Sequence, residues 1–217
     1  MKLSITIPSL PTRTDNLKRL YSKIESQIPA ESKDVEILSI VDNKTMSIGR
    51  KRQLLFQVSR GQYICQIDDD DDISEDFVSS LLQAIEETKG IPEVINYIQR
   101  CNLDGSILYV HPSIIHPQDD RNTITDNITE IKTMYRYPWH WSCWRSDIAK
   151  QGMFYDCNWG EDTLFPKIMK TIVTKEYFIP KVLVHYNFTT TGTEAPFIPF
   201  DLSKLVISDA KLTETLK

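Results

Sequence analysis

The start of the chain alternates between a strand, a helix and a second strand, and this order restricts the possible folds most strongly. Residues 3–7 alternate in polarity and end at Pro8, as a short strand does. Apolar positions then recur at helical spacing over residues 14–28, and residues 35–41 form a nearly continuous apolar strand. Two strands joined through a helix pair in parallel with a right-handed crossover. The sequence therefore predicts an α/β domain.

Five consecutive aspartates, Asp68 to Asp72, follow a short apolar segment and precede a predicted helix start at Ser74. Adjacent carboxylates repel one another, and folding alone does not require five of them. Carboxylate oxygens are the ligands that Mg²⁺ and Mn²⁺ prefer. A solvated acidic turn is the alternative interpretation. The position between a buried strand and a helix favours a metal site.

The segment before this strand predicts a helix over residues 48–59 with three cations, Arg50, Lys51 and Arg52, in its first turn. Cations are unfavourable there because of the helix dipole, so a nearby anion such as phosphate is expected; a solvated basic face is the alternative. Strand ends gather at one edge of a parallel sheet. Asp42, the aspartate run and the basic turn would meet there and could hold a metal diphosphate between them.

The rest of the sequence predicts further elements with mixed strand order. These are a helix after Phe77, a hairpin around residues 102–105, a long polar loop at residues 111–129, an aromatic segment at residues 136–144, a short helix at residues 146–151, a helix after Asp162, and two strands at residues 176–179 and 181–188.

Composition sets outer bounds on the class of protein. With 217 residues and 41% hydrophobic content, the chain can build one sizeable core. A net charge of -5 argues against nucleic-acid binding over the whole surface. Four cysteines without CxxC spacing favour free thiols in a reducing compartment. Neither a signal peptide nor a run of ~20 apolar residues is visible, so a cytoplasmic protein without a membrane span is expected.

Several motifs together resemble the family-2 glycosyltransferases of the GT-A type, in particular small phage-encoded or bacterial members. GQYICQIDDDD is similar to the family's strand and DxD motif, and GEDTLF to its Glu-Asp element before a helix. LSITIPSLPTR, LSIVDN, GRKRQ and VLVHYNF are similar to further family segments. The chain departs from the pattern at Gln53, where Asn is usual, and in a shortened segment between Asp42 and Gly49.

The resemblance implies one GT-A, Rossmann-like domain over residues 1–188, with a mixed, mostly parallel central sheet flanked by helices. Residues 1–98 would form the nucleotide-sugar-binding half and residues 99–188 the acceptor and catalytic half. Residues 189–217 would be a C-terminal tail or lid.

The resemblance also implies roles for individual residues. The nucleotide sugar would contact Pro8, Asp42, Lys51, Arg52, Asp68 and Asp69. Mn²⁺ or Mg²⁺ would be held by Asp68, Asp70 and His185, although Asp71 could replace one of the aspartates; a satisfied core histidine is the alternative for His185. Asp162, with Glu161 beside it, would be the general base. We expect the surplus Asp72 to face solvent or the helix that follows.

The aromatic segment contributes candidates for acceptor binding, because aromatic faces stack on sugars and bases. These are Trp139, His140 and Trp141, with Trp144 close by. An aromatic core and a hydrogen-bonded structural histidine are the alternatives.

The implied activity is metal-dependent, inverting transfer of a sugar from a nucleotide diphosphate sugar to an acceptor hydroxyl, with UDP as the commonest carrier in the family. The acceptor could be a glycan or, for a phage enzyme in the host cytoplasm, a hydroxymethylated DNA base. Alternatives from other classes are a nucleotidyltransferase and a non-catalytic sugar-nucleotide-binding module.

Overall fold

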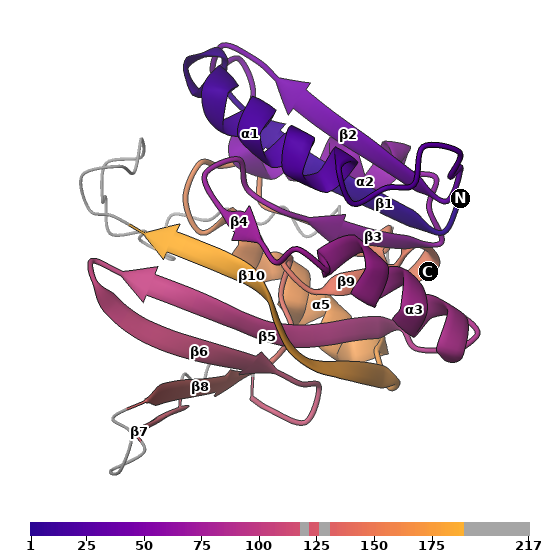
Figure 1. Cartoon of the computed structure of the whole chain (residues 1–217). Coiled ribbons are helices and arrows are strands. Elements are labelled where there is room, and N and C mark those ends of the chain that lie inside the picture. Colours follow the sequence, from indigo (N-terminus) through magenta and orange to yellow (C-terminus); the bar gives the residue numbers. More distant parts are fainter. Residues whose placement is uncertain (118–121, 126–130, 189–217) are drawn as a thin grey trace, which may run out of the picture.

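The computed structural model describes residues 1–117, 122–125 and 131–188 (Figure 1). Its strands are β1 (Leu3–Ser9), β2 (Val35–Val41), β3 (Tyr63–Gln66), β4 (Asp72–Ile73), β5 (Val94–Leu103), β6 (Ser106–Pro112), β7 (Asn122–Thr125), β8 (Lys132–Arg136), β9 (Cys143–Arg145) and β10 (Glu176–Phe188). Its helices are α1 (Thr14–Glu25), α2 (Ile48–Val58), α3 (Phe77–Glu87), α4 (Ser146–Ala149) and α5 (Leu164–Ile172). Two 3₁₀ turns, Pro11–Arg13 and Glu161–Thr163, precede α1 and α5.

These strands form one mixed sheet in the described part of the chain, in the order β2-β1-β3-β9-β5-β6-β8-β7, with β10 beside β5 and β4 beside β10. The parallel ladders β1–β2, β1–β3, β5–β10 and β6–β8 hold most of the paired residues. The prediction of a single α/β domain with a mixed, mostly parallel sheet flanked by helices is confirmed.

Two apolar clusters cover the two faces of the central strands. Leu3 and Ile5 of β1 pack on the face covered by α1 and α3. Ile64 of β3 and Trp144 of β9 point to the opposite face, where α2 and α5 contribute Phe56 and other apolar residues. Figure 1 shows α1 and α3 on the near side of the sheet and α2 and α5 behind it. Alternation along each strand therefore gives the sheet a core on both sides.

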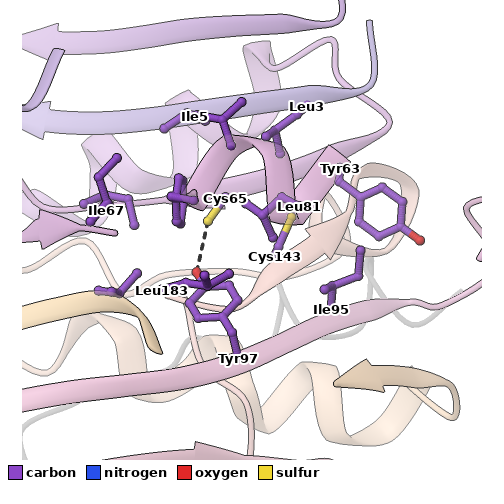
Figure 2. Close-up of a cluster of buried hydrophobic side chains, with 14 of the residues drawn as sticks. Leu3, Ile5, Tyr63, Cys65, Ile67, Leu81, Ile95, Tyr97, Cys143 and Leu183 are labelled. Atoms are coloured by element: carbon purple, nitrogen blue, oxygen red, sulfur yellow. Dashed lines mark hydrogen bonds between the residues drawn. The ribbon is translucent and has the colours of Figure 1, made fainter. Parts of the chain in front are cut away.

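Figure 2 shows the first of these clusters, in which Cys65 and Tyr97 lie side by side at its centre. The Cys65 sulfur is 3.1 Å from the Tyr97 hydroxyl, which also donates a hydrogen bond to the Trp141 carbonyl. Cys65, Cys101 and Cys143 are buried free thiols, and Cys157 is a partly exposed one. The expectation of free cysteines is confirmed.

The predicted hairpin forms between β5 and β6, with Asp104 and Gly105 at positive φ (48° and 89°) in a two-residue turn. Two predictions were wrong, and three strands were missed. The expected loop at residues 111–129 begins with the end of β6 and includes β7. The two expected final strands are one strand, β10, which passes Pro180 with a shift of register against β5. The short strands β4, β8 and β9 were not predicted.

The predicted tail or lid at residues 189–217 lies outside the described residues. The division into two halves at residue 98 stays a prediction, and β5 crosses that point without interruption. None of the helices in the described ranges has the length and apolar character needed to span a membrane.

Candidate functional site

The carboxyl ends of the parallel strands β1, β2 and β3 meet at one edge of the sheet, and polar residues follow each of them. Ser9 ends β1, Asp42 follows β2, and the aspartate run follows β3. Pro8 lies within β1, paired with Ile40, directly before Ser9. This is the edge at which ligands bind in open α/β sheets.

Arg52 of α2 is the centre of a buried charge network at this edge. Its two terminal nitrogens donate to both carboxylate oxygens of Asp68, at 2.9 and 3.0 Å. Its Nε donates to Glu161 at 3.1 Å. Only 6% of the Arg52 side chain is exposed, so these contacts replace the water that the guanidinium loses. Arg52 thereby joins the aspartate run to the Glu161–Asp162 element. Glu161 lies 109 residues after Arg52 in the chain.

Burial and charge act in opposite directions on the two carboxyls that Arg52 contacts. Burial alone would raise the pKa of Asp68, but the Arg52 guanidinium outweighs it and the pKa lies below its usual value. For Glu161 burial prevails over Arg52, and the pKa is raised. Asp68 is therefore held ionised by its partner, whereas Glu161 is the carboxyl in this pair that takes a proton more readily.

Arg13, in the 3₁₀ turn after β1, binds the middle of the aspartate run. It donates to Asp69 at 2.8 Å and to Asp70 at 2.9 Å. The second oxygen of Asp69 accepts from the Ser9 hydroxyl at 2.5 Å. Our sequence analysis gave no role to Arg13 or Ser9, although both lie in the motif LSITIPSLPTR. A basic residue in the turn that follows the first strand was the signal that could have found Arg13.

The aspartates alternate in burial along the run. The side chains of Asp68 and Asp70 are 21% and 39% exposed, whereas Asp69 and Asp71 are buried. Burial, aided by the neighbouring carboxylates, raises the pKa of Asp69, Asp70 and Asp71. Within the described residues, Oδ2 of Asp71 is buried without a hydrogen-bond partner. The arginines and hydrogen bonds therefore do not fully offset the burial and the mutual repulsion of these three carboxylates.

Asp72 corrects one of our expectations. Its carboxylate does not face solvent alone or α3, but accepts from Arg19 and Lys23 of the preceding helix α1, each at 3.2 Å. These contacts hold its pKa below the usual value against the effect of burial. The helix that supplies the cations lies about fifty residues earlier in the chain, which is why the local sequence did not show the pairing.

The residues fit a divalent cation of the kind that is shared with a substrate. No group of three or more His, Cys, Asp or Glu side chains in the described ranges is arranged to enclose a metal by itself. Mg²⁺ in nucleotide sites typically takes only one or two carboxylates, with phosphate oxygens and water as its other ligands. The partly exposed Asp68 and Asp70 could supply those carboxylates. His185 lies on β10 opposite Asp72 of β4, so the backbone places it next to the run.

The first turn of α2 does not form the expected phosphate cradle. Its amides are already occupied: Ile48 N donates to Asn158, Gly49 N donates to the Cys157 carbonyl, and Arg50 N donates to the Ser47 hydroxyl. The contacts leave no room above Gly49, where an added Cβ would lie 1.7 Å from the Tyr155 carbonyl oxygen. The loop before Glu161 therefore docks on the turn that we expected to bind an anion.

Lys51 is buried and forms an ion pair with Asp42, and its amine also donates to the Ser9 carbonyl at 2.8 Å. The other oxygen of Asp42 accepts from the backbone of Thr45 and Met46. Burial would raise the pKa of Asp42, but Lys51 and these hydrogen bonds lower it well below its usual range. Asp42 thus organises the turn after β2, and its predicted contact with a nucleotide stays a prediction.

Asp162 lies in the 3₁₀ turn before α5 and faces His140. The Nδ1 atom of His140 is 3.3 Å from Oδ2 of Asp162. The Asp162 side chain is 23% exposed and that of His140 is 4% exposed. Burial would raise the pKa of Asp162, but His140 and then Arg52 outweigh this and hold it well below the usual range. Asp162 is therefore an ionised carboxylate at the edge of the site.

The aromatic segment divides between core and site. Trp144 is fully buried in the cluster on the α2 and α5 face, and Trp141 is buried against Tyr186 with ring centroids 4.5 Å apart. Neither presents a ring face for stacking. Trp139 is partly exposed, and the Arg136 guanidinium already lies 3.4 Å from its ring centroid. The predicted aromatic acceptor surface is thus not formed by Trp141 or Trp144, for which the core alternative holds.

No protein-family model matches the chain, and no curated protein matches it in sequence. The fold is nevertheless similar to solved structures. S. aureus TarS, residues 1–349, aligns with a TM-score of 0.63 and 14% identity over 86% of this chain and 60% of that one. The same fragment in complex with UDP-GlcNAc aligns with a TM-score of 0.63 and 13% identity, over 100% of this chain and 64% of that one. The chain spans less than two thirds of these fragments and 37% of the longer TarS structure.

Proposed function

We propose that the chain is a glycosyltransferase that moves a sugar from a nucleotide diphosphate sugar, with UDP as its carrier, to an acceptor hydroxyl. The observation that carries the proposal is the meeting of two motifs at one sheet edge: Arg52 joins Asp68 of the DxD-like run to Glu161, beside Asp162. The likeness in fold to TarS, which has been solved with UDP-GlcNAc and with UDP, supports the choice of donor.

In the proposed reaction Asp162 removes the proton of the acceptor hydroxyl. The acceptor oxygen then forms a bond to the anomeric carbon from the side opposite the diphosphate. The bond between that carbon and the diphosphate oxygen breaks, and its electron pair leaves with the nucleoside diphosphate, so the configuration inverts. Asp162 is available as the proton acceptor because it is ionised and partly exposed.

Mn²⁺ or Mg²⁺ is part of the proposal, with Asp68 and Asp70 as its protein ligands and His185 as a further candidate. Such an ion neutralises charge on a departing diphosphate. Asp68 would keep its bidentate contact with Arg52 while binding, and Asp70 would exchange part of its contact with Arg13. Pro8, Asp42, Lys51 and Asp69 are proposed to contact the nucleotide sugar, since they lie at or next to the carboxyl ends of β1, β2 and β3.

The test is release of UDP from UDP-GlcNAc and other UDP-sugars, measured with Mn²⁺ or Mg²⁺ and with glycan or hydroxymethylated-DNA acceptors. UDP without pyrophosphate is expected, because nucleotidyl transfer would release pyrophosphate instead. Asp162→Asn should lower turnover roughly 10²- to 10⁴-fold, the range of base catalysis, with donor affinity retained.

Asp147→Asn is the matched control, since Asp147 is an exposed carboxylate on α4 that pairs with Arg145 away from the site. Equal turnover in wild type and Asp162→Asn would remove Asp162 from the mechanism. Donor binding without any product would favour a non-catalytic sugar-nucleotide-binding module.

A further inference from the structure

His140 is a buried imidazole with unmet hydrogen-bonding capacity. Its side chain is 4% exposed, and neither ring nitrogen has an aligned hydrogen-bond partner among the described residues. A buried polar group without partners costs free energy, so such a group in a folded protein calls for a cause. The contact that His140 does make is with Asp162, at 3.3 Å between Nδ1 and Oδ2.

The ring of His140 packs against two tryptophans, which also contact each other with ring centroids 4.4 Å apart. The ring centroids of Trp139 and Trp141 lie 5.4 and 5.3 Å from that of His140. Trp139 is itself fixed, because its indole N–H donates to Gln99 at 3.1 Å. These neighbours limit rotation of the imidazole, so its Nδ1 is directed at Asp162 by the packing.

Exposure distinguishes two possible divisions of labour between His140 and Asp162. If His140 were the base and Asp162 its orienting carboxylate, the imidazole would need to reach the acceptor. The exposed fractions are the reverse of this, 4% for His140 and 23% for Asp162. An incoming hydroxyl can therefore meet Asp162, and His140 lies behind it.

We propose that His140 is a positioning residue for Asp162: a proton on Nδ1 faces Oδ2 and leaves the other carboxylate oxygen directed at the acceptor hydroxyl. This inference rests on the proposed function. Other charged groups that act on Asp162 are directed elsewhere: Arg52 at Asp68 and Glu161, and Arg136 over Trp139. At 3.3 Å the contact is long for a hydrogen bond, and such contacts often tighten when substrate binds.

Three substitutions separate positioning from packing. His140→Asn retains an N–H close to the position of Nδ1, His140→Gln moves its N–H towards the position of Nε2, and His140→Phe keeps a ring without either. We expect His140→Phe and His140→Gln to lower kcat about 100-fold, the cost of a reacting group misplaced by about 1 Å, with KM for the donor unchanged. His140→Asn should recover most of that loss.

The pair should also behave as one unit. His140→Phe combined with Asp162→Asn is expected to be no slower than Asp162→Asn alone, because the positioning acts only through the carboxylate. His116→Gln is the matched control, since His116 packs against Tyr135 and takes no part in the site. Full kcat in His140→Phe, or an additive loss in the double variant, would overturn the proposal.

NMR spectroscopy of the imidazole nitrogens decides the contact whether or not the chain transfers sugar. The chain has four histidines, so the His140 signals are identified by their loss in His140→Asn. We expect a proton on Nδ1 in the wild type and a changed Nδ1 signal in Asp162→Asn. A proton on Nε2 alone, or an Nδ1 signal that is the same in the wild type and in Asp162→Asn, would refute the inference. Absence of transfer by the wild type would instead refute the proposed function.

Discussion

Replacing Arg52 by methionine is the perturbation that tests the architecture of the site most severely. The substitution keeps the volume of an unbranched side chain and removes three charge-assisted hydrogen bonds, two to Asp68 and one to Glu161. Removing one partner of a buried ion pair costs roughly 3–5 kcal/mol, because the other charge stays buried. Asp68 is 21% exposed and can regain some water, so the lower end, about 3 kcal/mol, is expected.

Thermal unfolding is the assay. For a domain of this size each kcal/mol lowers Tm by roughly 2–4 °C, so Arg52→Met should melt about 6–12 °C below the wild type at pH 7. Arg50→Met is the matched control, because Arg50 is 59% exposed and lies 3.7 Å from an equally exposed Asp156. Its Tm should stay within about 2 °C of the wild type, as for other surface substitutions.

The pH dependence gives the same prediction a second test. In the wild type the pKa of Asp68 is lower in the folded state than in the unfolded state. The ionised carboxylate therefore stabilises the fold at pH values above its unfolded-state pKa, and this stabilisation is lost as the pH falls through the folded-state pKa. Without Arg52, burial would raise the pKa of Asp68, and that of Glu161 further. Protonation of these two carboxyls as the pH falls from 7 to 5 would then remove their buried charge and reduce the Tm difference between the variant and the wild type. A Tm difference that stays below about 2 °C, or that widens towards pH 5, would refute the network as described.

Three further substitutions test the supporting structure by thermal unfolding. Gly49→Ala should lower Tm and increase proteolysis of the segment after Tyr155, because its Cβ would lie 1.7 Å from the Tyr155 carbonyl oxygen; an unchanged Tm would contradict the docking of that loop. Tyr97→Phe removes the hydroxyl that donates to the Trp141 carbonyl in the buried core and leaves that acceptor unpaired, for a loss of about 1–3 kcal/mol. Gly105→Ala, with nothing within 4 Å but a φ of 89°, should cost less than Gly49→Ala.

The first half of the fold was predictable because each element carries its own local signal. β1 alternates in polarity, β2 and β3 are largely apolar, each is followed closely by a proline or an aspartate, and the helices between them have clear apolar faces. β9 carries no such signal. It is three residues long and lies between β3 and β5, so its strand conformation depends on neighbours that are distant in sequence.

The candidate site was predictable as a set of residue types and not as a set of contacts. The aspartate run and the Glu161–Asp162 element could be recognised as motifs. Which cation pairs with which carboxylate depends on tertiary placement: Arg52 reaches Asp68 and Glu161, whereas the adjacent Arg50 faces outwards to Asp156. The turn of cations was interpreted as an anion site because the sequence does not show that the protein's own carboxylates neutralise it: Lys51 pairs with Asp42, and Arg52 with Asp68 and Glu161.

The most direct test of the central claim is binding of UDP-GlcNAc and UDP in the presence of Mn²⁺ or Mg²⁺, measured as the rise in Tm of the protein. A ligand at 100 times its Kd stabilises the folded state by about 2.7 kcal/mol, which corresponds to roughly 5–11 °C for a domain of this size. A stabilisation that requires both nucleotide and metal, and is lost in Asp70→Asn but not in Asp147→Asn, is the predicted result. If neither UDP nor any UDP-sugar raises Tm with either metal, the assignment of this sheet edge as a nucleotide-sugar site is contradicted.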